Sequence, residues 1–204
     1  MTDFAPLPAP PDVPTAAQIA DAIATGFPAE QRARATEMLG PIVLWQFRSA
    51  ATFPKPRRLA EVVYENLVDE LRPVTADKRV DALETIACRT TGEKLLGDGM
   101  GLAIARWRLD HPGKAVPAPW DEMSAPWVGR STVQLGAEAD TRLTEIERLT
   151  KDKTGDCREA MRMSLLHARM ALGSAKTGSF STAAGSMVDF LRQVGESPRI
   201  LDVH

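Results

Sequence analysis

The sequence predicts an all-α fold, a bundle of about seven or eight helices, and both composition and apolar spacing indicate it. Alanine outnumbers valine and isoleucine together, and leucine, alanine, arginine, glutamate and methionine dominate the segments with helical periodicity. No segment sustains the alternation of apolar and polar residues, bounded by Asn-Gly or Asp-Gly turns, that is typical of paired strands. With 204 residues, 44% of them hydrophobic, the chain is long enough to bury a sizeable core.

The helices are placed by apolar periodicity, capping residues and prolines. The first begins at Thr15, because Thr15 and Gln18 fit a capping box, and it ends near Thr25. Pro41 falls inside the second helix and is expected to kink or split it. The glycine-rich residues 92–101 are expected to interrupt the helical pattern. The other helices are expected over 29–50, 58–71, 76–90, 102–109, 132–150, 155–173 and 181–195. No internal repeat is found.

Two proline-rich segments divide the chain. Five of the first fourteen residues are prolines, which fix φ and remove amide donors, so an extended arm is predicted there. This arm is either solvated or lies on its own domain or on a neighbouring subunit. A second set of prolines, interleaved with Trp120 and Trp127, indicates a connector between two helical blocks. The expected parts are an arm (1–14), an N-terminal block (15–109), a connector (110–131), a C-terminal block (132–195) and a tail (196–204).

Charge and cysteine usage limit the class of protein. Lys and Arg number 25 against 27 Asp and Glu, a net charge of −2, which excludes nucleic-acid binding through bulk positive charge. Cys88 and Cys157 are far apart and in no CxxC pattern, so they are interpreted as reduced thiols. No stretch of about 18 apolar residues is present, so no membrane span is expected. These observations together predict a cytoplasmic protein.

No complete catalytic set is found, and no cofactor or metal is predicted. The sequence has no GxSxG and no HExxH, and the glycines of 92–101 miss the spacing of a phosphate-binding loop. His167 lies in an apolar helix and is interpreted as a core residue, whereas His111 is expected in an exposed loop. A magnesium-dependent nucleotide hydrolase is one alternative, although its expected order of acidic residues is reversed here. That alternative would use the carboxylates of Glu61, Glu65, Asp81 and Glu84.

Basic residues suggest nucleic-acid contact as a second function. Arg158, Arg162 and Arg169 fall within about 40° of one another on one helix, and Lys176 extends the row. The segment 30–58 is also locally basic, and such patches can contact phosphates in a chain that is neutral overall. The other interpretation pairs these cations with the acidic stripes of neighbouring helices, at 61–70 and 138–147. The further candidate residues are Arg48, Lys55, Arg57 and Arg58.

The helix over 155–173 carries apolar residues on both sides of its arginine row, among them Met163 and Met170. A helix apolar over most of its circumference is either buried centrally or contacts a second chain. Methionine adapts to irregular partner surfaces, and Trp120 and Trp127 are further candidate anchors for protein contact. The leading hypothesis is therefore a non-enzymatic helical subunit that binds copies of itself or other proteins in a multi-subunit assembly.

Overall fold

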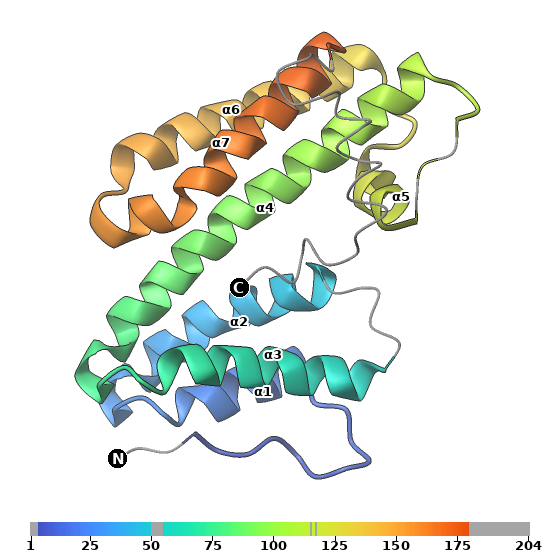
Figure 1. Cartoon of the computed structure of the whole chain (residues 1–204). Helices are drawn as coiled ribbons and strands as arrows, with labels where there is room; N and C mark the ends of the chain where they lie inside the picture. Colours follow the sequence, from blue (N-terminus) through green and yellow to red (C-terminus); the bar gives the residue numbers. More distant parts are fainter. Residues whose placement is uncertain (1–3, 50–54, 115, 117, 180–204) are drawn as a thin grey trace. The chain divides into compact units, whose positions relative to one another are not determined.

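Figure 1 shows a computed structural model of the chain, which describes residues 4–49, 55–114, 116 and 118–179. Within these residues it contains seven α-helices, three short 3-10 helices and no strand, which confirms the all-α prediction. The chain forms two compact units, residues 1–90 and 91–204, and the division falls inside the long helix α4 (Arg79–Asp110). The predicted connector is itself folded, because it contains α5 (Ala118–Ser124) and the turn η3 (Ala125–Trp127).

The first unit packs α1 (Ala16–Ala24), α2 (Arg32–Ser49) and α3 (Pro56–Leu71) around one apolar core. The predicted capping box is confirmed, since the Gln18 amide donates to Thr15 Oγ1 over 3.3 Å while the Gln18 side chain accepts from the Thr15 amide. Helix α2 continues through Pro41, so the predicted split does not occur; the proline lies exposed on the outside of the helix. The largest fully buried side chains of this core are Ile19, Ile23, Phe27, Leu39, Ile42, Leu67, Leu71, Leu83 and Ile86.

The proline-rich arm lies on its own unit. The Ala5 amide donates to Thr25 Oγ1 (2.7 Å), and the Tyr64 hydroxyl donates to the Ala5 carbonyl (2.8 Å). Further along, the Arg57 guanidinium donates to the Pro8 carbonyl over 2.9 Å and also to the Asp12 carbonyl. Of the arrangements considered from sequence, the structure therefore shows the arm docked on its own domain.

Two turns of the first unit are closed by the same kind of arginine-to-carbonyl hydrogen bond. The 3-10 turns η1 (Ala29–Gln31) and η2 (Ala76–Lys78) are each followed by an arginine that begins the next helix, Arg32 or Arg79. Each arginine Nε donates, over 3.1 Å, to the carbonyl five residues earlier. The two stretches Ala-Glu-Gln-Arg and Ala-Asp-Lys-Arg are thus a short internal repeat that the sequence analysis missed.

The second unit is built on α4, α6 (Thr132–Asp152) and α7 (Gly155–Thr177), and α6 and α7 run side by side (Figure 1). Helix α4 is continuous, so the predicted interruption at 92–101 is wrong. Its glycines permit close packing: a Cβ on Gly92 would lie 3.0 Å from that of Met161, and one on Gly99 would lie 3.1 Å from the Ala168 carbonyl oxygen. Gly101 is tighter, because a Cβ there would lie 2.3 Å from the Trp127 ring. These glycines therefore allow other segments to pack closely against α4, and they do not interrupt the helix.

Candidate functional site

The outer face of α7 is the strongest candidate for a functional surface. One side of the helix is buried, through Met161, Leu165, Ala168, Ala171, Leu172 and Ala175. Met163, Leu166 and Met170 lie on the opposite side and expose 47%, 48% and 44% of their surface. At about 100° per residue these three fall within about 60° of one another. We call Met163, Leu166 and Met170 the apolar row.

Charged and polar residues border the apolar row. Arg158, Arg162, Arg169 and Lys176 are exposed and project along one edge of it. On the other side His167 is exposed too, so its interpretation as a core residue is wrong. His167 projects only about 40° from Met163 around the helix, which places it on the outer face.

The basic edge of α7 is largely engaged within the second unit. Arg162 Nε donates to its neighbour Glu159 over 3.0 Å, and Lys176 Nζ pairs with Asp140 of α6 at 2.7 Å. An Arg169 guanidinium nitrogen lies 3.3 Å from the Thr150 hydroxyl oxygen. Arg158 forms no ion pair with any residue that the structure describes.

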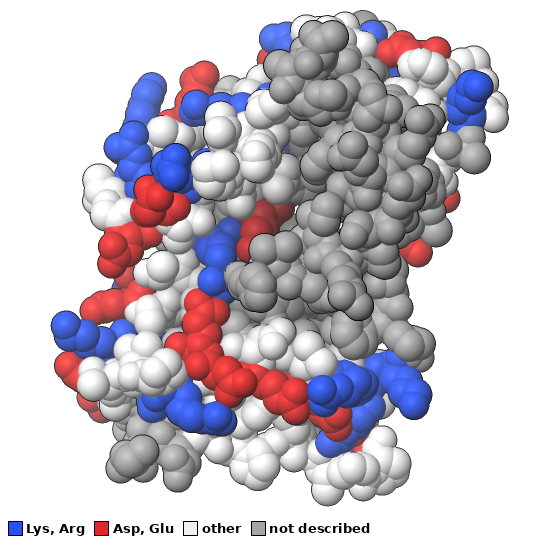
Figure 2. Space-filling view, in the orientation of Figure 1, with Lys and Arg blue, Asp and Glu red and all other residues white. Residues whose placement is uncertain are grey.

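Of the four basic residues predicted in the first unit, Arg57 and Arg58 pair with acidic neighbours, whereas Arg48 and Lys55 do not pair with a described residue. Arg57 pairs with Glu61 at 2.9 Å, and Arg58 lies 3.4 Å from both Glu61 and Glu65. Arg48 and Lys55 are exposed, and neither pairs with another residue that the structure describes. On the face shown in Figure 2, basic and acidic side chains lie next to one another instead of forming one broad basic surface.

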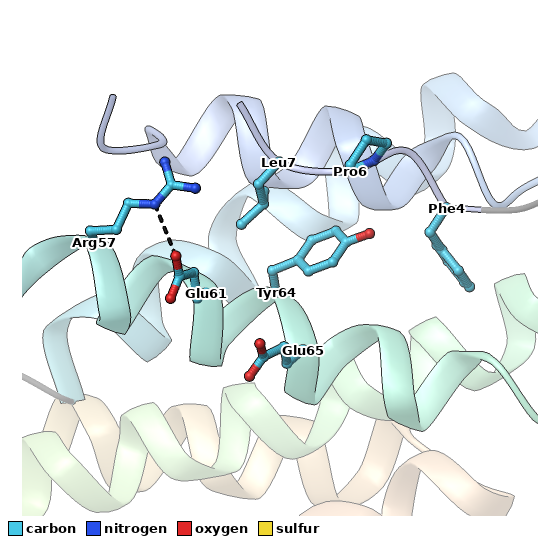
Figure 3. Close-up of a pocket in the computed structure, with 7 residues that line it drawn as sticks. All are labelled: Phe4, Pro6, Leu7, Arg57, Glu61, Tyr64 and Glu65. Atoms are coloured by element: carbon cyan, nitrogen blue, oxygen red, sulfur yellow. Dashed lines mark hydrogen bonds and ion pairs between the residues drawn. The ribbon is translucent and has the colours of Figure 1, made fainter. Parts of the chain in front are cut away.

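A shallow pocket of about 380 Å³ lies between the arm and α3. Figure 3 shows the arm crossing α3 near Tyr64, with the Arg57–Glu61 ion pair at one end and Phe4 at the other. The hydrogen bond from Arg57 holds the pKa of Glu61 below its usual value, so this carboxylate is ionised and already partnered. We therefore assign the pocket to docking of the arm. Its lining residues are Phe4, Pro6, Leu7, Arg57, Glu61, Tyr64 and Glu65.

The carboxylates considered for a magnesium site are mostly engaged by arginines. Glu61 and Glu65 contact Arg58, and Glu84 pairs with Arg34. Among the described residues, no three or more His, Cys, Asp or Glu side chains gather in a group that could hold a metal ion. The geometry thus gives the hydrolase alternative no support.

The two candidate tryptophan anchors are buried in the second unit. Trp120, 6% exposed, packs with Met100, Ile104 and Ala171. Trp127, 7% exposed, lies against Gly101. The guanidinium carbon of Arg142 lies over the Trp127 ring, 5.5 Å from the ring centre. Both rings therefore contact their own chain and leave little surface for a partner, whereas Met163 and Met170 are exposed.

The interpretation of the cysteines as reduced thiols is wrong for this structure. Neither Cys88 nor Cys157 is a free thiol, and both are disulfide-bonded. Spacing along the sequence gave no signal for this, because two distant cysteines carry no motif.

No helix in the described part of the chain is long and apolar enough to cross a membrane. Comparison of the chain with family models, with curated proteins and with solved structures finds no match.

Proposed function

We propose that this protein is a non-enzymatic helical subunit that acts by binding another protein chain, and that the outer face of α7 is its contact surface. The observation that carries the proposal is the apolar row, in which three large apolar side chains are each nearly half exposed. Adjacent exposed apolar groups of this kind mark interaction surfaces, whereas single ones are ordinary. Two of the three are methionines, whose flexible thioethers adapt to irregular partners.

The charges around the row fit a protein partner. Arg158, Arg162 and Arg169 border one edge of the row, and Glu159 lies one turn before Met163 at the N-terminal end of the row. The surface therefore has an apolar centre and a charged rim. Protein interfaces have this arrangement, in which the centre supplies affinity and the rim supplies specificity.

A photo-reactive amino acid in place of Leu166 tests the proposal in cells that express the protein at its natural level. Irradiation is expected to join it to a second polypeptide, which mass spectrometry identifies as another copy or a different protein. The matched control carries the same probe in place of Val133, which is 79% exposed but lies outside the apolar row. Equal labelling from both positions, or none from position 166, contradicts the proposal.

Nucleic-acid binding is a second candidate, supported by the four cations along one edge of α7. Arg158 is the strongest candidate for a phosphate contact, since within the described part of the chain it forms no ion pair. This function predicts salt-sensitive mobility shifts with DNA or RNA that weaken in Arg158→Ala and Arg169→Ala. Absence of any complex at low salt rules it out.

The cytoplasmic location expected from sequence stays a prediction. It has lost one of its premises, because both cysteines are disulfide-bonded and disulfides persist mainly in oxidising compartments.

A further inference from the structure

We propose that the part of the first unit that holds the arm is a binding groove for an extended proline-rich segment of another polypeptide, and that the arm is its internal occupant. We call this surface the arm groove and define it by four residues that contact the arm: Thr25, Arg57, Tyr64 and Arg79. The inference goes beyond the function proposed for α7, because the arm groove and the apolar row share no residue.

The arm presents one face to the groove, and its exposure repeats every three residues. Over residues 4–9, Pro6 and Ala9 are exposed, whereas the residues at the other positions are half-buried. A polyproline helix has three residues per turn, so residues three apart lie on the same face. Phe4 and Leu7 are such a pair, and both pack against the core of the first unit. Figure 3 shows Leu7 directed toward α3 and Pro6 directed away from it.

The arm groove recognises the arm mainly through backbone carbonyls. The Ala5 carbonyl accepts from the Tyr64 hydroxyl (2.8 Å), and the Pro8 carbonyl, three residues later, accepts from Arg57 (2.9 Å). A polyproline backbone forms no internal hydrogen bonds, so its carbonyls are free to accept, and its prolines have no amide that needs an acceptor. Contacts to the backbone and to two side chains do not require a covalent connection. A segment of another chain with the same spacing can therefore make them.

One end of the arm groove is a seat for an aromatic ring. The guanidinium carbon of Arg79 lies 4.8 Å from the centre of the Phe4 ring. On another side of the ring is Gly26, where a Cβ would collide with the Phe4 side chain. Arg79 is itself buried, so the seat combines a glycine that leaves room with a cation that faces the ring. The groove is thus expected to select a segment with an aromatic residue three positions before an apolar one.

The arm fills this groove incompletely, which leaves room for a tighter ligand. The pocket of about 380 Å³ between the arm and α3 is lined by Leu7 on one side and by Tyr64 and Glu65 on the other. A larger apolar side chain at the position of Leu7 would fill more of the pocket and remove more apolar surface from water. Such a ligand can compete with the tethered arm. The arm of a second copy is less favoured, because it makes the same contacts without the tether.

Synthetic peptides of residues 4–14, measured by fluorescence anisotropy with the full-length protein, test the inference. One peptide has the native sequence, one carries Leu7→Trp, and a control peptide carries Phe4→Ser and Leu7→Ser. The proteins are the wild type, an open variant with Phe4→Ser and Leu7→Ser in its own arm, and a matched control with Pro6→Ser and Ala9→Ser. Circular dichroism shows whether each protein is folded.

The native peptide is expected to bind the open variant at least about tenfold more tightly than the wild type or the matched control, because no intact tethered arm competes there. Adding Tyr64→Phe to the open variant is expected to weaken this binding about fivefold, since one hydrogen bond to the peptide is lost. The Leu7→Trp peptide is expected to bind the wild type about tenfold more tightly than the native peptide does. This last comparison does not depend on the folding of any variant.

The inference is overturned if neither the native nor the Leu7→Trp peptide binds the wild type, or if the control peptide binds as tightly as they do. Equal affinity of the native peptide for all three proteins overturns it as well. Wild-type dimers that the native peptide dissociates, detected by light scattering, assign the groove to the arm of a second copy and also overturn it. None of these results bears on the crosslinking at Leu166, which tests the function of α7 separately.

Discussion

Arg79 connects three parts of the first unit through one guanidinium. It is 8% exposed, donates to the carbonyls of Val74 and Gly26, and lies 4.8 Å from the centre of the Phe4 ring. One residue thus holds the turn before α4, the turn after α1 and the start of the arm. The sequence does contain a signal for this role of Arg79: Arg32 occupies the same position in a second turn with a similar sequence.

Replacement of Arg79 by alanine is expected to lower the free energy of unfolding by about 2–4 kcal/mol, because its hydrogen bonds to two carbonyls are lost. Denaturant unfolding measures the change. Arg72→Ala is the matched control: its pair with Asp69 is largely exposed, so a loss below about 1 kcal/mol is expected. Equal losses in the two variants would show that Arg79 has no special role.

Glu138 gives the second unit a dependence on pH. Hydrogen bonds from Arg142 and then Arg130 hold the pKa of Glu138 below its usual value of 4.5. Since the pKa is lower in the folded state, the stabilisation is present above pH 4.5 and is lost as the pH falls through the folded pKa. Thermal unfolding between neutral and acidic pH is therefore expected to lose less stability in Glu138→Gln than in the wild type. A loss of the same size in both proteins contradicts this assignment.

At the scale of elements, apolar periodicity predicts most helices, because each face that contacts the core repeats along its own sequence. Thr15 and Gln18 marked one helix start through a purely local capping box. The role of the α4 glycines cannot be predicted from local sequence, because it depends on α7 and Trp127, which lie far away in sequence. The same holds for the apolar row: periodicity shows that α7 is apolar on several sides, but only packing shows which side is left exposed.

Alanine substitutions at Gly101 and Gly136 distinguish the effect of close packing between segments from the effect of helix propensity. Alanine at position 101 would place its Cβ 2.5 Å from the Met123 carbonyl oxygen as well as against Trp127, so we expect a loss of about 1–3 kcal/mol. Alanine at position 136 meets no atom within 4 Å and is expected to stabilise α6 by about 0.5–1 kcal/mol. Denaturant unfolding of both variants measures the difference. A stabilising Gly101→Ala would contradict the close packing of α4.

At the scale of the whole molecule, the stability of the fold depends on the oxidation state of the two cysteines. Cys88 and Cys157 are both disulfide-bonded, and disulfides typically contribute about 2–4 kcal/mol. The denatured protein is therefore expected to take up two alkyl groups only after reduction, and dithiothreitol is expected to lower its melting temperature. The variant Cys88→Ser, Cys157→Ser is the control, in which the reductant changes nothing. Alkylation without reduction would contradict the oxidised state.

The N-terminal arm is hydrogen-bonded to its own unit, whereas the apolar row leaves one face of α7 exposed for contact. The arm's hydrogen bonds join residues far apart in sequence, such as Ala5 and Tyr64, so no local pattern could predict where it docks. The partner-binding role of α7 is the central claim. It concerns three side chains that can be changed without touching the core.

The most direct measurement is the affinity of the purified protein for the polypeptide joined to it at position 166, by isothermal titration calorimetry. Three proteins are compared: the wild type, the triple variant Met163→Ser, Leu166→Ser, Met170→Ser, and the control Val133→Ser. Loss of a buried apolar centre is expected to weaken binding by about a hundredfold or more in the triple variant and to leave the control unchanged. The same affinity in all three proteins would contradict the assignment of α7 as the contact surface.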